Sequence, residues 1–133
     1  MLQAPKRNCT NCPKRAIAAP TGVISGGLPW LNFRAVKVAP GITSVETAGH
    51  TPGHTSFVIA SGSSKILFQA DVSNVPDLFL THPDWQVMFD SEPEKAAVTR
   101  RRVYDMAAAE KMFIAGYHFP FPGLGWVETT AIG

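Results

Sequence analysis

Two short apolar runs joined by a glycine-containing polar linker constrain the fold of this 133-residue chain more than any other feature. Ser56–Ala60 and Lys65–Gln69 are rich in β-branched, aromatic and other apolar residues, and they flank Ser61-Gly62-Ser63-Ser64. This pattern is typical of an antiparallel hairpin with a short turn. Its largest side chains alternate, which predicts that one face of a sheet carries four of them: Phe57, Ile59, Ile66 and Phe68.

The remaining periodicity predicts further strands and one long helix. Strands are expected at 34–38, 42–47, 112–115 and 126–128, with a loop over 72–90 that contains a helical turn at 76–80. A helix is expected from Ser91 to about Lys111, with Ser91 as its cap, Pro93 in its first turn and Glu94 completing a capping box. One side of this helix collects Ala96, Arg100, Val103, Ala107 and Glu110, and Met106 widens its apolar stripe. Arg100, Arg101 and Arg102 are nevertheless expected to reach water.

Length and composition indicate a soluble globular domain. The formal net charge of +2 and the lack of a basic-aromatic motif argue against a nucleic-acid partner. No apolar run approaches the roughly 20 residues that span a bilayer, and the N-terminus does not resemble a signal peptide, so a cytoplasmic location is expected. Residues 1–22 are rich in Pro, Asn, Lys and Arg and are expected to form a flexible leader. Cys9 and Cys12 within it lack the neighbours that a zinc or redox site needs, and are interpreted as surface thiols.

Three side chains suited to metal binding follow turns or apolar runs. His54 ends Thr51-Pro52-Gly53-His54, Asp71 follows Ile66–Ala70, and His118 follows Met112–Tyr117. Each is expected just past the C-terminal end of a strand, which would gather the three at one rim of a sheet. Imidazole nitrogen and carboxylate oxygen are ligands that zinc accepts. The pattern therefore predicts a metal site built from His54, Asp71 and His118.

These motifs resemble the last three metal-ligand motifs of the metallo-β-lactamase superfamily. The resemblance covers roughly residues 28–128. The run from Gly41-Ile42-Thr43 to Phe121-Pro122-Gly123 most resembles the branch of methyl parathion hydrolase and lactonase-like hydrolases. It implies the C-terminal half of an αββα sandwich: an α+β fold with a mainly antiparallel sheet and one long helix. Residues 23–133 would form this half-domain.

The resemblance also implies how the ligands would divide. The family holds two metal ions, typically zinc; the His54-like residue binds the first, the His118-like residue binds the second, and the Asp71-like carboxylate bridges them. Most other ligands come from a His-x-His-x-Asp-His cluster, which is absent among the 4 histidines here. Each ion would keep two ligands from this chain.

The residues themselves leave other roles open. Asp71 could cap the following turn through Ser73 or Asn74, and His118 could be a rim histidine bonded to a carbonyl. His50, four residues before His54, is expected to support the ligands or to end a strand rather than to bind metal. His82 is expected in an exposed loop. Phe119, Phe121 and Trp85 are candidates for the wall of a substrate pocket, with ordinary core packing as the alternative.

Two classes of function follow. The first is a metal-dependent hydrolase of an ester, lactone or phosphotriester, with its ligand set completed by a second chain or by a missing N-terminal half. The second is a non-catalytic remnant or interaction module that retains the half-fold. In both, the apolar face of Phe57 and Phe68 predicts a homodimer through an isologous contact between two sheets.

Overall fold

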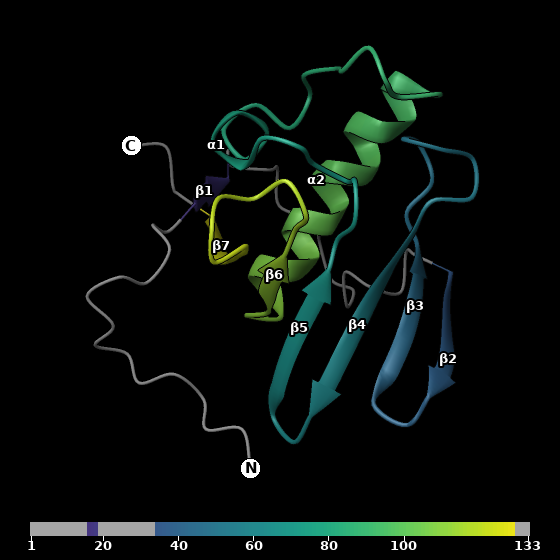
Figure 1. Cartoon of the computed structure of the whole chain (residues 1–133), viewed down its shortest axis with the longest axis vertical. Helices are drawn as coiled ribbons and strands as arrows, with labels where there is room; N and C mark the ends of the chain where they lie inside the picture. Colours follow the sequence, from purple (N-terminus) through teal and green to yellow (C-terminus); the bar gives the residue numbers. More distant parts are fainter. Residues whose placement is uncertain (1–15, 19–33, 130–133) are drawn as a thin grey trace.

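The computed structural model describes residues 16–18 and 34–129. The strands in these residues form one mixed sheet in the order β1-β7-β6-β5-β4-β3-β2 (Figure 1). The pairs β1–β7 and β5–β6 are parallel and the other neighbours are antiparallel, so the predicted α+β fold with a mainly antiparallel sheet and one long helix is confirmed. The elements are β1 Ala16–Ala18, β2 Ala35–Ala39, β3 Ile42–Glu46, β4 Thr55–Ser61, β5 Ser64–Phe68, α1 Pro76–Phe79, α2 Pro93–Ala109, β6 Phe113–Ala115 and β7 Leu124–Thr129.

The predicted hairpin is confirmed as β4 and β5. Its turn is tighter than expected, because β4 extends to Ser61 and β5 begins at Ser64. Gly62 takes a φ of 58°, a left-handed conformation that glycine adopts without a steric penalty. The register pairs Phe57 with Phe68 and Ile59 with Ile66, so the four large side chains share one face as predicted.

The long helix is confirmed over Pro93–Ala109, but the predicted capping box is wrong. Glu92 occupies the cap position without a side-chain capping hydrogen bond, and Pro93 begins the helix. The backbone N–H groups of Ser91 and Glu92 donate instead to the carbonyls of His50 (2.9 Å) and Gly49 (3.0 Å). This long-range backbone pairing fixes the entry to α2, so a side-chain cap at Ser91 is not what starts the helix.

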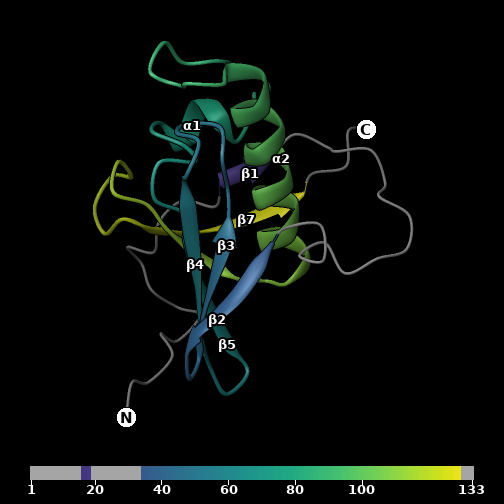
Figure 2. The ribbon, with the colours of Figure 1, turned by 90° about the vertical axis from the view of Figure 1, so that its right-hand side faces the viewer.

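Helix α2 covers one face of the sheet (Figure 2). The face beneath it and the inner side of the helix form a continuous core whose members include Val45, Leu67, Ile114, Val127, Val103, Tyr104, Met106 and Ala107. The opposite face is also apolar but partly exposed: Phe57 retains 39%, Phe68 37% and Trp126 37% of its surface. Phe113 and Trp126 pack ring against ring on it, with centroids 3.7 Å apart. This second face is called the open face below.

Strand β1 lies within the segment expected to be a flexible leader. Ala16–Ala18 pairs in parallel with Val127–Thr129 at one edge of the sheet. The rest of that segment, with Cys9 and Cys12, lies outside the described residues. None of the helices in the described residues is long and apolar enough to cross a membrane. The cytoplasmic location stays a prediction.

Candidate metal centre

The sheet brings His54, Asp71 and His118 to one edge. Strands β5 and β6 run parallel, so the segments that follow them, with Asp71 and His118, emerge at the same edge. His54 reaches that edge by a different route from the one expected. It directly precedes Thr55, the first residue of β4, and β4 is antiparallel to β5, so its beginning lies beside the end of β5.

His54 is buried, and both of its ring nitrogens have partners of fixed polarity. Nδ1 lies 3.0 Å from the carbonyl oxygen of Thr47, which can only accept. Nε2 lies 3.0 Å from the backbone N–H of Asp71, which can only donate. The ring is therefore neutral, with its proton on Nδ1 and its lone pair on Nε2. Burial lowers the pKa of His54, against smaller opposing effects of the Thr47 hydrogen bond and the Asp71 charge, which favours this neutral form.

A chain of buried hydroxyl groups holds the Nδ1 side of this ring. Thr47 Oγ1 lies 2.8 Å from His54 Nδ1 and 2.9 Å from Ser56 Oγ. Ser56 Oγ donates in turn to the carbonyl of Gln69 at 3.0 Å. These bonds join the ends of β3, β4 and β5, and they fix the orientation of the imidazole before any ligand arrives. An oriented imidazole of this tautomer is what a metal ligand requires.

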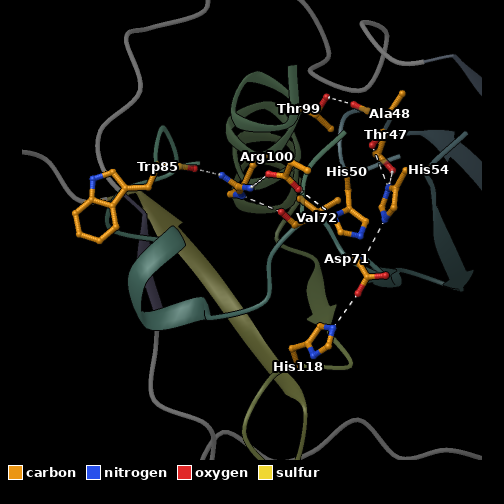
Figure 3. A network of polar contacts seen from close by, with 11 residues as sticks. Thr47, Ala48, His50, His54, Asp71, Val72, Trp85, Thr99, Arg100 and His118 are labelled. Atoms are coloured by element: carbon orange, nitrogen blue, oxygen red, sulfur yellow. Dashed lines mark hydrogen bonds and ion pairs between the residues drawn. The ribbon is translucent and has the colours of Figure 1, made fainter. Parts of the chain in front are cut away.

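Asp71 sits in a sharply constrained turn. Ala70 before it has a φ of 53°, unusual for a residue with a side chain, and Gln69 Nε2 donates to the carbonyl of Ser73 at 2.9 Å across the turn. The Asp71 carboxylate lies 3.0 Å from His118 Nε2, and the His118 side chain is 51% exposed. Figure 3 shows Asp71 between the two histidines. The structure thus joins the three predicted residues into one cluster.

His50 contacts this cluster from the protein side. Its ring stands edge-on to that of His54, with centroids 5.9 Å apart and planes at 84°. Its Nδ1 lies 2.9 Å from Asp90 Oδ1, whose carboxylate is 1% exposed. A supporting role for His50 fits this placement. Sequence reasoning missed Asp90, which carries no motif and meets His50 only through the tertiary fold.

The prediction that Arg100, Arg101 and Arg102 all reach water is wrong for Arg100. Arg100 is 1% exposed and lies 3.4 Å from Asp90 Oδ2, with its guanidinium 4.3 Å above the Phe79 ring. Burial lowers the pKa of Arg100, against the smaller opposing electrostatic effects of Tyr104 and Asp90. A signal was present in the sequence, because Arg100 falls on the same helical side as Ala96 and Val103.

The three aromatic residues proposed for a pocket wall lie in different environments. Phe119 packs against the core, whereas Phe121 is 99% exposed. Trp85 stacks on His82 with centroids 4.3 Å apart, and Figure 3 shows it across Arg100 from His54. Their role at a substrate stays a prediction. His82 is exposed, as expected for its loop.

The donor types fit zinc, but the described residues supply too few of them. No group of three or more His, Cys, Asp or Glu side chains within residues 16–18 and 34–129 has the arrangement of a metal site. Two features explain this: the Asp71 N–H occupies His54 Nε2, and the Asp71 carboxylate turns toward His118. A catalytic zinc ion commonly takes three protein ligands, so the ligand set needs residues beyond these.

Comparison with known proteins identifies the family. The family model described as "Metallo-beta-lactamase superfamily" matches residues 3–118, further toward the N-terminus than the motifs alone indicated. The N-acyl homoserine lactonase AiiA of Bacillus thuringiensis subsp. kurstaki is 31% identical over 93 residues, which are 65% of this chain and 36% of the relative.

Two solved structures share the fold. The hydrolase AbOPH of the beta lactamase superfamily superposes with a TM-score of 0.67 at 31% identity, over 71% of this chain and 32% of that one. AidC, a dizinc quorum-quenching lactonase, superposes with a TM-score of 0.68 at 30% identity, over 74% of this chain and 33% of that one. The chain spans about a third of the length of the relatives it matches. Fold, motifs and family match together show that this chain belongs to the metallo-β-lactamase superfamily.

Proposed function

We propose that this chain contributes part of the metal centre of a metal-dependent hydrolase that acts on lactones or related esters. The observation that supports this most is the state of His54: a buried, neutral imidazole whose Nε2 lone pair faces the Asp71 turn. The similarity to two lactonases favours a cyclic or acyclic ester over a phosphotriester as substrate.

Each residue would have a distinct role at a zinc site. His54 would bind through Nε2, with Nδ1–H anchored on Thr47, and Asp71 would move its N–H away from that nitrogen. Asp71 would present its carboxylate between two ions, and the exposed His118 would turn to the second. Zinc, when bound, supplies a Lewis acid that polarises the carbonyl oxygen of the substrate. The remaining ligands would come from residues outside the described part of this chain or from a second copy of it.

Metal content per chain tests this proposal. Protein purified without a chelator or a metal-binding tag, then equilibrated with zinc, is expected to hold near-stoichiometric metal by elemental analysis. His54→Ala and His118→Ala should both lose it. His82→Ala is the matched control, because His82 lies in an exposed loop and stacks on Trp85. Retention of metal by all three variants, or a folded wild type that takes up none, would contradict the proposal.

Substrate class is tested on the metal-loaded protein. An N-acyl homoserine lactone, an aryl ester and a phosphotriester should be hydrolysed in that order of rate, and the rates should fall in parallel with metal in the two histidine variants. A metal-loaded protein that hydrolyses none of them would favour the second class of function, a non-catalytic module.

The open face supports a proposal about the partner. Two rows of paired residues cross it: Val36, Ser44, Phe57, Phe68, Ala115 and Leu124, then Ile42, Ile59, Ile66, Phe113 and Trp126. Ser44 is the one polar residue in these rows. Packed sheets need two such faces, and a second copy of this chain offers the same face. We therefore propose a homodimer in which two sheets pack face to face and both candidate metal centres lie at the rim.

Oligomeric state tests the homodimer. Light scattering over a dilution series is expected to show a dimer that dissociates at low concentration. Phe57→Lys, which places a charge on the open face, should raise the dissociation constant at least tenfold. Val98→Lys, at an exposed position on α2, is the control and should leave it unchanged. A folded monomer at every concentration would contradict this proposal and leave the metal proposal to its own test.

A further inference from the structure

One buried side chain links the segments of two of the three candidate ligands, Asp71 directly and His54 through other side chains. Arg100, near the middle of α2, is 1% exposed, and its guanidinium donates to three backbone carbonyls. Nε lies 2.8 Å from the oxygen of Val72, and Nη1 lies 3.0 Å from that of Pro83 and 2.7 Å from that of Trp85. Val72 directly follows Asp71, so the first of these bonds fixes the end of the Asp71 turn.

The same guanidinium reaches the His54 side through two further groups. Its Nη2 lies 3.4 Å from Asp90 Oδ2, and Asp90 Oδ1 lies 2.9 Å from His50 Nδ1. The His50 ring abuts that of His54. The neighbouring residue adds a second tether, because Thr99 Oγ1 donates to the carbonyl of Ala48 at 2.7 Å. Figure 3 shows Thr99 and Arg100, neighbours on α2, with the residues of both segments around them.

The backbone before His54 also presses directly on this helix. Gly49 has a φ of 142°, and a Cβ built at this position would lie 2.5 Å from the Cα of Ala96. No other residue type fits so close an approach. The segment over residues 47–50 is therefore seated on α2, while the Asp71 turn is held from the same helix by Arg100.

We propose that Arg100 is a positioning residue of the candidate metal centre, which sets the place of Asp71 relative to His54. The geometry suits arginine specifically. A guanidinium offers five N–H groups in a rigid fork and can serve several carbonyls and a carboxylate at once. A lysine at this position keeps the charge but presents its donors from a single point, so it cannot span Val72, Trp85 and Asp90 together.

The first test needs no metal. In the full chain without metal, the Asp71 N–H donates to His54 Nε2, so its hydrogen exchange measured by NMR reports the spacing of the two segments. Arg100→Lys should reduce protection at Asp71 at least tenfold more than it reduces protection at the amides of Leu67 and Ile114, which lie on buried strands and report global unfolding. Arg101→Lys is the matched control. The Arg101 side chain is 40% exposed, and its ion pair with the exposed Asp84 is long, at 4.0 Å.

Two outcomes would overturn the proposal. One is unchanged protection at Asp71 in Arg100→Lys, and the other is a uniform loss at Asp71, Leu67 and Ile114, which marks a purely structural residue. If Arg100→Lys does not fold, Asp90→Asn carries the test, since it keeps the side-chain volume and removes the charge between Arg100 and His50. It should shift the imidazole ¹⁵N resonances of His54 as well as those of His50. Unchanged His54 resonances in a folded Asp90→Asn protein would count against the proposal.

The second test concerns zinc and rests on the proposed function. Residues that orient metal ligands typically change metal affinity on the order of 10- to 100-fold when replaced. Arg100→Lys should weaken zinc binding by that factor in a chelator competition, and Arg101→Lys should not. If Arg100→Lys binds zinc as tightly as the wild type, the proposal that Arg100 positions Asp71 relative to His54 is contradicted. A wild type that binds no zinc would refute the metal proposal alone, because the exchange result does not depend on it.

Discussion

Leu67 and Phe68 are neighbours on β5 and lie in different environments. Leu67 is completely buried beneath α2, whereas Phe68 on the open face keeps 37% of its surface exposed. Both faces of the sheet carry large apolar side chains, so hydrophobicity does not distinguish them. The difference comes from α2, which covers one face and also carries Thr99 and Arg100, whose side chains donate hydrogen bonds to the carbonyls of Ala48 and Val72. The buried core therefore lies on the helix side of the sheet.

The largest effect is expected from the buried cation on that side. Arg100→Met leaves Asp90 buried without its counter-charge and three carbonyls without a donor, and should lower the free energy of unfolding by about 3–5 kcal/mol. Arg101→Met, which removes an exposed arginine, should change it by less than about 0.5 kcal/mol. Urea denaturation followed by circular dichroism measures both. Equal losses of unfolding free energy in the two variants would mean that the buried contacts of Arg100 do not stabilise the fold more than an exposed arginine does.

The two sheet faces can be compared directly through the neighbours on β5. Leu67→Ala creates a cavity in the core and should cost about 2–5 kcal/mol. Phe68→Ala removes a side chain that is already partly in water, and in a dilute, monomeric sample should cost only about 1 kcal/mol. Chemical denaturation of both variants checks this pair. A cost for Phe68→Ala as high as for Leu67→Ala would show that the open face is covered in solution.

The same comparison of buried and exposed side chains applies to two candidate ligands, His54 and His118. His54→Ala removes a buried ring that satisfies the Asp71 N–H and the Thr47 carbonyl, and should cost about 1–3 kcal/mol in metal-free protein. His118→Ala removes a half-exposed ring with one hydrogen bond to the Asp71 carboxylate, and should cost about 0.5 kcal/mol or less. Thermal denaturation in the presence of a chelator ranks them. A larger loss for His118→Ala would contradict the interpretation that His54, rather than His118, is held in place by the fold without metal.

A smaller effect than that of His54→Ala is expected at Thr47. Thr47→Val removes the hydroxyl between His54 Nδ1 and Ser56 Oγ, yet His54 Nδ1–H keeps the Thr47 carbonyl and Ser56 keeps the Gln69 carbonyl. Because each remaining group stays bonded, the cost should be about 1 kcal/mol, and the His54 tautomer should be unchanged in its ¹⁵N spectrum. A switch of the proton to Nε2 would show that the hydroxyl, not the carbonyl, fixes the ring.

Local patterns in the sequence predicted most of the elements. The alternation on either side of Gly62 fixed the hairpin, and the apolar spacing from Ala96 to Ala107 fixed the long helix. The order of His54, Asp71 and His118 along the chain carried the family resemblance, and the structure brings the three together. These features depend on residues close in sequence, or on motifs that are short and contiguous.

The tertiary structure decided what lies against each element. Periodicity shows that Arg100 shares a side with Val103, but only the packed fold supplies the carbonyls and the carboxylate that allow a cation to be buried there. In the same way, alternation places Leu67 and Phe68 on opposite faces, and the position of α2 decides which is covered. The capping box predicted at Ser91 does not form, because the Ser91 N–H donates to the carbonyl of His50, 41 residues earlier. Such contacts join residues far apart in the chain, so no local pattern reports them.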